Sequence, residues 1–289
     1  MNNHRIGIIT VLYNSMSVLS DFINSCISQE GVNYKLYCID NNSSDGTIEF
    51  LESYDNLNIK IVKNRKNYGF AKATNQGIKI ALEEKCDYIL LINNDTIFDK
   101  NMISTLLMDL QRYNGNYISP KIVDFYNPNI IAWSGGWFSF WRAYANIARG
   151  KGEIDNQQYE TVEETQNAPF CCVLFQASCF NKNELLDERF FVYWEDVDWC
   201  YNAFKKKLRL LYTPNTKIIH KESSLTGMFS SFKISQLAEG RAKYLKKNFG
   251  YFSKFFFLPL VVATPFKLLL TKKISISLFF KYIIKYING

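Results

Sequence analysis

The alternation of short apolar runs with amphipathic segments in the first hundred residues constrains the fold more than any other feature. Four runs are typical of buried strands: IGIITVLY (6–13), YKLYCID (34–40), NIKIV (58–62) and DYILLI (87–92). Helical patterns separate them. Strands joined by helices form βαβ units, so we predict an α/β fold with a mainly parallel sheet and helices on both faces. Ligands of such sheets bind at the carboxyl ends of the strands, which places a nucleotide-type site in this region.

The second half of the sequence is less regular. Residues 115–170 have scattered Gly, Asn, Trp and Pro and no sustained period, which indicates loops and short strands that shape a second binding surface. After Phe170 the pattern predicts a strand at 171–180, an acidic aromatic stretch FFVYWEDVDWCYNAF (190–204) with a helix to about Lys206, and a strand at 208–220.

The net charge of +7 is concentrated at one end of the chain. Residues 241–289 contain ten of the 34 Lys and Arg residues and none of the 27 acidic ones. The first 240 residues therefore carry 24 basic and 27 acidic side chains. This distribution argues against a nucleic-acid-binding body and favours contact between the tail and an anionic surface.

The tail is apolar as well as basic. Its longest uncharged apolar run, 255–266, includes Pro259 and Pro265 and is shorter than the roughly 20 residues that a bilayer-spanning helix needs. Aromatic and aliphatic groups interrupted by lysines are typical of a segment that lies in the membrane interface. The alternative is a pair of helices packed on the domain with a solvated basic face.

Cysteine usage and the N-terminus bear on location. The seven cysteines form no C-x-x-C pair, which is typical of reduced, buried cytosolic thiols rather than of disulfides or a zinc site. The first residues lack the pattern of a secretory signal. We therefore expect a cytoplasmic protein at the inner face of the cell membrane, attached peripherally by its tail.

Polar groups follow three of the predicted strands, as Asp40-Asn41-Asn42, Asn93-Asn94-Asp95 and His220. Strand ends of an open parallel sheet face one crevice, so Asp40 and Asp95 are candidates for the same site. Asp95 with neighbouring amide oxygens suits Mg²⁺ or Mn²⁺. The alternative for both segments is a turn or a helix cap. The chain has no G-x-G-x-x-G after the first strand and no P-loop, so binding of a diphosphate would require a metal.

Five segments in order resemble one known family: IITVLYN, DNNSSDGT, NYGFAKATNQGI, LLINNDT and FFVYWEDVDWCYNAFKKKLRLLYTPNTKIIH. They resemble the inverting glycosyltransferases of family two, with a GT-A (Rossmann-like) fold, and within that family the rhamnosyltransferase-like branch. The resemblance extends over about residues 6–224. It implies a GT-A domain at 1–228, with a nucleotide-sugar half (1–100) and an acceptor and catalytic half (101–228), followed by a helical tail at 229–289.

The resemblance also implies roles for individual residues. The metal on the diphosphate would be held by Asp95, although Asn93 stands where the family has its first acid, which weakens that site. His220 would reach the metal or the diphosphate. The donor-binding residues would be Thr10, Tyr13, Asn14, Asp40, Asn67, Gly69, Phe70, Asn75, Asn93 and Asn94.

The acidic motif Glu195-Asp196 would supply the general base, which we assign to Asp196. Inverting transfer is a single displacement at the anomeric carbon, so the base belongs on the acceptor side. Burial would raise the pKa of Asp196, whereas the helix N-terminus would lower it. Asp198 or Glu195 could instead satisfy backbone N–H groups of the first helical turn.

Several other residues have two interpretations. Ser223, Ser224, Arg142, Arg149 and Lys151 could contact phosphate, although charged loop residues are usually only solvated. Trp133, Trp137 and Trp141 are four residues apart, as in a helical core stripe, but their Gly-rich surroundings favour a platform for the acceptor.

The expected activity is therefore metal-assisted transfer of a sugar from a nucleoside diphosphate to a cell-surface polysaccharide or lipid-linked glycan. The branch points to dTDP-L-rhamnose as donor, and a UDP-hexose or UDP-galactofuranose remains open. A catalytically silent sugar-nucleotide-binding module is the alternative from another class. A nucleotidylyltransferase or dehydrogenase is excluded because the first strand is not followed by the required glycine-rich loop.

Overall fold

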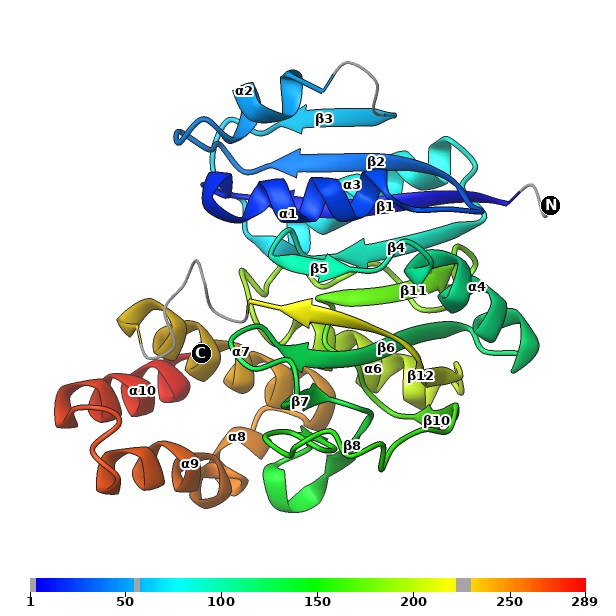
Figure 1. Cartoon of the computed structure of the whole chain (residues 1–289). Coiled ribbons are helices and arrows are strands. Elements are labelled where there is room, and N and C mark those ends of the chain that lie inside the picture. Colours follow the sequence, from blue (N-terminus) through cyan, green and yellow to red (C-terminus); the bar gives the residue numbers. More distant parts are fainter. Residues whose placement is uncertain (1–3, 55–57, 222–229) are drawn as a thin grey trace.

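The structure, a computed structural model of the whole chain, describes residues 4–54, 58–221 and 230–289 (Figure 1). The strands are β1 (Arg5–Leu12), β2 (Asn33–Asp40), β3 (Ile59–Lys63), β4 (Tyr88–Ile92), β5 (Thr96–Phe98), β6 (Tyr117–Asp124), β7 (Ile131–Trp133), β8 (Gly136–Ser139), β9 (Ala145–Ala148), β10 (Glu163–Thr165), β11 (Cys172–Gln176) and β12 (Leu210–His220).

Helices connect and cover these strands. They are α1 (Met16–Ile27), α2 (Thr47–Glu52), α3 (Phe70–Glu83), α4 (Met102–Arg112), the 3₁₀ helix η1 (Phe140–Arg142), α5 (Cys179–Lys182), α6 (Glu195–Lys205), α7 (Ser231–Phe249), α8 (Ser253–Phe256), α9 (Leu258–Leu270) and α10 (Ile276–Asn288).

One large sheet forms the centre of the protein, in the order β10-β12-β6-β11-β4-β1-β2-β3. The four strands predicted in the first hundred residues are parallel neighbours, with β1 between β2 and β4, and β2 pairing with β3. The predicted α/β fold is therefore confirmed. In Figure 1, α1 lies in front of this half of the sheet and α3 lies behind it.

The other half of the sheet is mixed. β11 runs antiparallel to both β4 and β6, whereas β6 and β12 are parallel. β11 is also shorter than the strand expected at 171–180, because Cys179–Lys182 turns into α5. Within residues 115–170, β6 is a full strand of the sheet, and the remaining strands of this segment are short, as expected.

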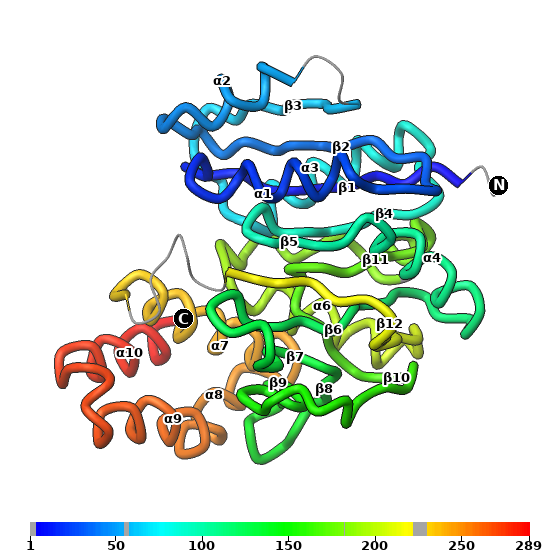
Figure 2. Tube along the Cα trace, in the orientation of Figure 1, coloured from blue at the N-terminus to red at the C-terminus, as the bar shows by residue number. Residues whose placement is uncertain are grey.

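The C-terminal helices make a second hydrophobic core. Ile234, Ala238 and Leu245 of α7 are buried there with Val197 of α6 and Tyr286 of α10. Figures 1 and 2 place α8, α9 and α10 beside the β6–β12 half of the sheet and away from β3. In the described residues no helix combines the length and the hydropathy needed to cross a bilayer.

Candidate active site

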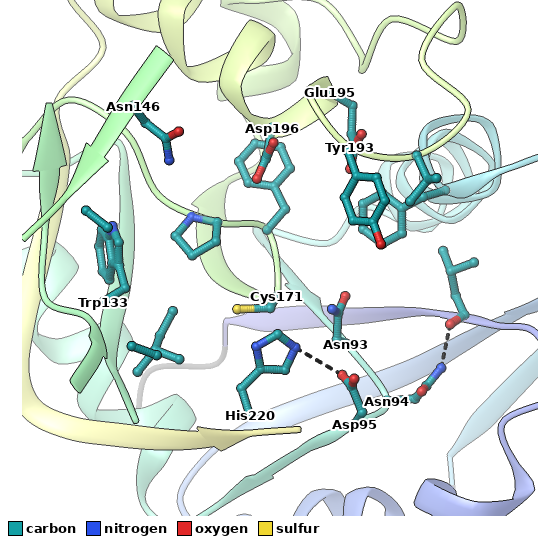
Figure 3. A pocket seen from close by; sticks show the side chains of 18 of the residues that line it. Asn93, Asn94, Asp95, Trp133, Asn146, Cys171, Tyr193, Glu195, Asp196 and His220 are labelled. Atoms are coloured by element: carbon teal, nitrogen blue, oxygen red, sulfur yellow. Dashed lines mark hydrogen bonds and ion pairs between the residues drawn. The ribbon is translucent and has the colours of Figure 1, made fainter. Parts of the chain in front are cut away.

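A pocket of about 390 Å³ lies where strands from both halves of the sheet end. Val11 comes from β1, Asn93 to Asp95 follow β4, and His220 ends β12. Figure 3 shows Asp95 and His220 on one side of the pocket and Asp196 on the opposite side. The polar and charged lining residues are Asn93, Asn94, Asp95, Asn146, Lys151, Tyr193, Glu195, Asp196, His220 and Lys233.

Strand pairing brings Asp95 and His220 together. β5 begins directly after Asp95 and runs antiparallel to β12, so Thr96 lies opposite His220. His220 Nε2 is 3.2 Å from Asp95 Oδ1. Burial alone lowers the pKa of His220, but Cys171 and the Asp95 carboxylate raise it, and the net shift is upward. The sequence-based expectation that these two distant residues share a site agrees with this geometry.

The opposite wall is the start of α6. Tyr193 and Trp194 have φ values of 67° and 75°, a left-handed turn that is uncommon for side chains of this size. The turn starts the helix at Glu195 and leaves Asp196 facing the pocket, as Figure 3 shows. Burial raises the pKa of Asp196 from 3.8 to about 6, while backbone N–H groups, including that of Val197 at 2.7 Å, oppose the shift. Of the two opposing effects considered for Asp196, burial is the larger.

Glu195 differs from its neighbour. Its side chain is buried, and in the described part of the chain its Oε2 has no hydrogen-bond partner. Burial raises its pKa well above 4.5, and the nearby Asp196 charge raises it further. An ionised Asp196 thus favours the protonated form of Glu195, an arrangement suited to a donor beside a base.

Asp198 contributes to the structure, although not as a helix cap. It is buried, and it accepts hydrogen bonds from Lys247 Nζ at 2.6 Å and Asn248 Nδ2 at 2.8 Å. Both partners are on α7. Asp198, two residues after Asp196 on the same helix, therefore ties α6 to α7.

The predicted donor-binding residues divide into two groups. Phe70, Asn93 and Asn94 line the pocket. Thr10, Tyr13, Asn14, Asp40, Asn67, Gly69 and Asn75 do not. Asn94 is held in place by donating to the Val11 carbonyl at 2.6 Å.

Asn14 and Asp40 join the loops beside the pocket. Asn14 Oδ1 accepts from the Ser44 backbone N–H at 2.9 Å, and Asp40 Oδ2 accepts from those of Asn42 and Ser43 at 3.1 Å each. The turn role considered for this segment is thus present. Thr10 is buried, and its hydroxyl has no partner within residues 4–54, 58–221 and 230–289, whereas Tyr13 is exposed.

The segment around Gly69 supports the loop that precedes Asp196. Asn75 donates to the Leu186 carbonyl at 2.8 Å and accepts from the Leu186 N–H at 3.0 Å, so its amide is used within the protein. Asn67 Oδ1 accepts from the Gly69 N–H. Gly69 has φ 85°, and a Cβ there would lie 2.4 Å from the Phe191 carbonyl oxygen. These residues position the loop that leads to Asp196.

Of the basic residues considered for phosphate contact, only Lys151 lines the pocket. Arg149 donates to the Ser134 carbonyl and forms an ion pair with Glu163, so it is structural. Arg142 lies outside the pocket lining, in η1. Ser223 and Ser224 fall outside the described residues.

The three tryptophans do not form a helical stripe, because they belong to β7, β8 and η1. Trp133 is buried and lines the pocket, and its Nε1 has no hydrogen-bond partner in the described chain. Of the three candidates for an acceptor platform, Trp133 is the one that lines the pocket. Trp137 and Trp141 are exposed.

Asn146, Cys171 and Lys233 are among the lining residues that sequence reasoning missed. Asn146 is on β9 and Cys171 precedes β11, and neither belongs to a polar motif. Lys233 is on α7, inside the segment assigned to the tail, and its ammonium lies 5.6 Å from the centre of the Tyr193 ring. Lys233 precedes the basic segment 241–289, so the charge pattern of the tail gave no signal for it.

The fit of a divalent cation can be tested on the donor groups. The described residues contain no cluster of three or more His, Cys, Asp or Glu side chains that would by itself hold a metal. Asp95 and His220 offer one oxygen and one nitrogen. Mg²⁺ is commonly held by one or two carboxylates together with substrate phosphates, so Asp95 fits a cation that a diphosphate helps to bind. His220 adds a ligand only when its imidazole is neutral.

Comparison with known proteins identifies the family and the fold. The protein family described as "Glycosyl transferase family 2" matches residues 7–183, which are more than half of the chain. The curated low-salt glycan biosynthesis hexosyltransferase Agl10 of Haloferax volcanii is 23% identical over 253 residues, which cover 87% of this chain and 78% of that protein.

Two solved structures share the fold. GalNAc-T7, crystallised with UDP, GalNAc and Mn²⁺, has a TM-score of 0.68 at 16% identity, with 86% of this chain and 50% of that one covered. TarS of S. aureus with UDP-GlcNAc has a TM-score of 0.63 at 14% identity, with 97% and 79% covered. The expected GT-A fold is thereby confirmed. The chain belongs to glycosyl transferase family 2.

Proposed function

We propose that this glycosyltransferase moves a hexose from a nucleoside diphosphate sugar to a glycan hydroxyl with inversion at the anomeric carbon. One observation carries the proposal: the pocket has Asp196 on one side and the Asp95–His220 pair on the other. Inverting displacement needs a base and a leaving-group site on opposite faces of the sugar. The family match covers residues 7–183 and so ends before Glu195, Asp196 and His220, whose roles rest on this geometry.

Asp196 acts as the base in this scheme. With a pKa of about 6 it is ionised at neutral pH and basic enough to accept the proton of the acceptor hydroxyl as that oxygen bonds to the anomeric carbon. The protonated Glu195 beside it donates a hydrogen bond to a sugar oxygen. The apolar walls formed by Val192, Phe70 and Trp133 exclude water and so limit hydrolysis of the donor.

The Asp95 side of the pocket receives the diphosphate. Asp95 and His220 would hold a Mn²⁺ or Mg²⁺ ion there, which offsets negative charge on the leaving group. Asn93 replaces the first acid of the family motif, so the protein supplies one carboxylate rather than two. The crystallisation of GalNAc-T7 with Mn²⁺ supports use of a divalent cation.

The proposed donor is a nucleoside diphosphate sugar, and several members of this class are candidates. dTDP-L-rhamnose follows from the motif resemblance, while the UDP in GalNAc-T7 and the UDP-GlcNAc in TarS favour a UDP-hexose. UDP-galactofuranose belongs to the same class. The name of Agl10 supports transfer of a hexose to a glycan.

For the acceptor and location, we propose a cell-surface polysaccharide or lipid-linked glycan at the inner face of the cell membrane. The apolar, basic tail supports this proposal. The division into a domain at 1–228 and a tail at 229–289 stays a proposal, and Lys233 of that tail lines the pocket.

The first test is calorimetric titration with dTDP, UDP, GDP and ADP, in Mn²⁺ and again in EDTA. Metal-dependent binding of one pyrimidine diphosphate is expected. Transfer is then compared in Asp196→Asn and in Asp99→Asn, which changes an exposed carboxylate just after β5. Asp196→Asn should abolish transfer but keep nucleotide binding, and Asp99→Asn should change neither. Nucleotide binding without any transfer by the wild-type protein, across the donor classes, would favour the silent binding module.

A further inference from the structure

We propose that the outer faces of α9 and α10, together with the turn at Phe140 and Trp141, form a surface that docks onto an anionic bilayer and turns the acceptor side of the pocket toward it. This inference extends the membrane contact in the proposed function to particular residues. It does not depend on the identity of the donor.

α10 has two apolar faces. Tyr282 and Tyr286 are buried against the protein. On the outer side Ile276, Phe280, Ile284 and Ile287 are exposed, Ile276 to 64%. Their spacings of four, four and three residues place them in one stripe of a helix with 3.6 residues per turn. A helix packed on a domain needs one apolar face, so the outer stripe remains unexplained by packing.

α9 repeats this arrangement. Val261 and Pro265 are buried, whereas the outer stripe consists of Pro259, Ala263, Phe266 and Leu270, at spacings of four, three and four. The two helices are neighbours, because the Phe266 ring lies 6.2 Å from that of Phe279, which flanks the α10 stripe. The two stripes therefore belong to one apolar surface. Figures 1 and 2 show α9 and α10 at the periphery of the molecule.

The charge around this surface identifies its occupant. Exposed lysines stand beside the stripes: Lys267, Lys272, Lys273, Lys281 and Lys285. No acidic residue occurs between 241 and 289. Apolar stripes whose charged neighbours within α9 and α10 are all cations complement a bilayer with anionic headgroups, in which the apolar groups enter the interface. A second copy of the chain would bring like charges together, which disfavours self-association.

The surface continues toward the pocket. The Phe140 ring is 5.5 Å from that of Phe257, which directly precedes α9, and the adjacent Trp141 is 76% exposed. Tryptophan is enriched at membrane interfaces. This turn leads into β9, whose Asn146 lines the pocket. An acceptor carried by a membrane lipid would reach the Asp196 side of the pocket along this edge.

The experiment is co-sedimentation of the full chain with vesicles of phosphatidylcholine, with and without phosphatidylglycerol. The variant Phe280→Glu/Ile284→Glu changes the outer stripe, and Met108→Glu changes an equally exposed residue on α4. Wild type and Met108→Glu should sediment with the anionic vesicles. The stripe variant should bind these vesicles at least about tenfold more weakly. Nucleotide binding by all three proteins shows that each is folded and tests the transferase proposal separately.

A second measurement checks the turn. Tryptophan emission should shift to the blue when anionic vesicles are added, and the shift should be smaller in Trp141→Phe. Equal sedimentation of the stripe variant and wild type would overturn the proposal. The proposal would also be overturned if the wild-type protein bound neither kind of vesicle. The same holds if the wild type were a dimer in sedimentation velocity and Phe280→Glu/Ile284→Glu were a monomer.

Discussion

Lys247 Nζ lies 2.6 Å from Asp198 Oδ2 and 2.9 Å from Asp187 Oδ2. One side chain of α7 therefore joins the loop before the acidic motif to the first turn of α6. Asp196 stands two residues before Asp198 on that turn. Gly240 of α7 packs closely against Trp194, because a Cβ at position 240 would lie 2.8 Å from Trp194 Cδ1. The geometry of the base thus depends on a helix that belongs to the C-terminal segment.

Lys247→Met should lower both stability and turnover. It leaves Asp198 buried without its cation, which typically destabilises by several kcal/mol, here reduced to about 2 kcal/mol because Asn248 still donates. As a positioning residue, Lys247 should affect kcat more than donor affinity, and Lys247→Arg should restore much of the loss. Lys246→Met is the control, because the Lys246 ammonium lies over the Tyr251 ring, whereas that of Lys247 pairs with Asp187 and Asp198. A Lys247→Met protein with wild-type Tm and kcat would contradict this role.

The pH dependence of transfer should report Asp196. The carboxylate must be ionised to accept a proton, so kcat/KM should fall about tenfold per pH unit below its pKa of about 6. Glu195→Gln should leave this inflection in place, because burial and the ionised Asp196 both favour the uncharged form of Glu195, which Gln mimics. An inflection near 4 in the wild type would show that Asp196 is not the titrating base.

Asp196→Asn should also stabilise the protein at neutral pH. Because the folded-state pKa of this acid lies above its ordinary 3.8, wild-type stability falls as the pH rises from about 4 to about 6, where the unfolded chain loses this proton and the folded protein keeps it, and stays at the lower level above pH 6. The variant avoids this ionisation, so its Tm should exceed that of wild type by a few degrees, about 2–4 °C per kcal/mol. The difference should disappear as the pH falls to 4. Thermal unfolding at pH 7.5 and pH 4 measures both.

The local sequence pattern was sufficient to predict the first four strands and to place Asp95 at the carboxyl end of the sheet, where the pocket lies. Each of those strands is a continuous apolar run, and a parallel sheet brings their ends together. The reversed direction of β11 was not predictable, because an apolar run has no direction. Asn75 and Lys247 act through contacts 111 and 49 residues away in sequence, with Leu186 and Asp198. Side chains committed to such distant partners look, in sequence, the same as side chains that bind ligand.

Removal of Asp95 and removal of the metal should both weaken binding of the nucleoside diphosphate. Asp95→Ala should weaken Mn²⁺-dependent binding of the nucleoside diphosphate, because it removes the carboxylate from the diphosphate side of the pocket. In EDTA, wild type and Asp95→Ala should bind the nucleotide equally. The comparison is made by calorimetry, with Asp99→Asn as the control. If Asp95→Ala weakened binding only in EDTA, the carboxylate would not be a metal ligand.

Gly69→Ala separates close packing from backbone strain. Gly69 has φ 85°, so any side chain there is strained, and its Cβ would also lie 2.4 Å from the Phe191 carbonyl oxygen. The Phe70 N–H donates to that oxygen at 2.6 Å, so relief of the clash must move the loop that leads to Asp196. Gly31→Ala is the matched control, because φ is 73° and no described atom lies within 4 Å of the added methyl. Both variants should lose about 1 kcal/mol of stability from strain, and only Gly69→Ala should lose turnover as well. Equal kcat values for the two variants would mean that the contact between Gly69 and Phe191 does not position the base.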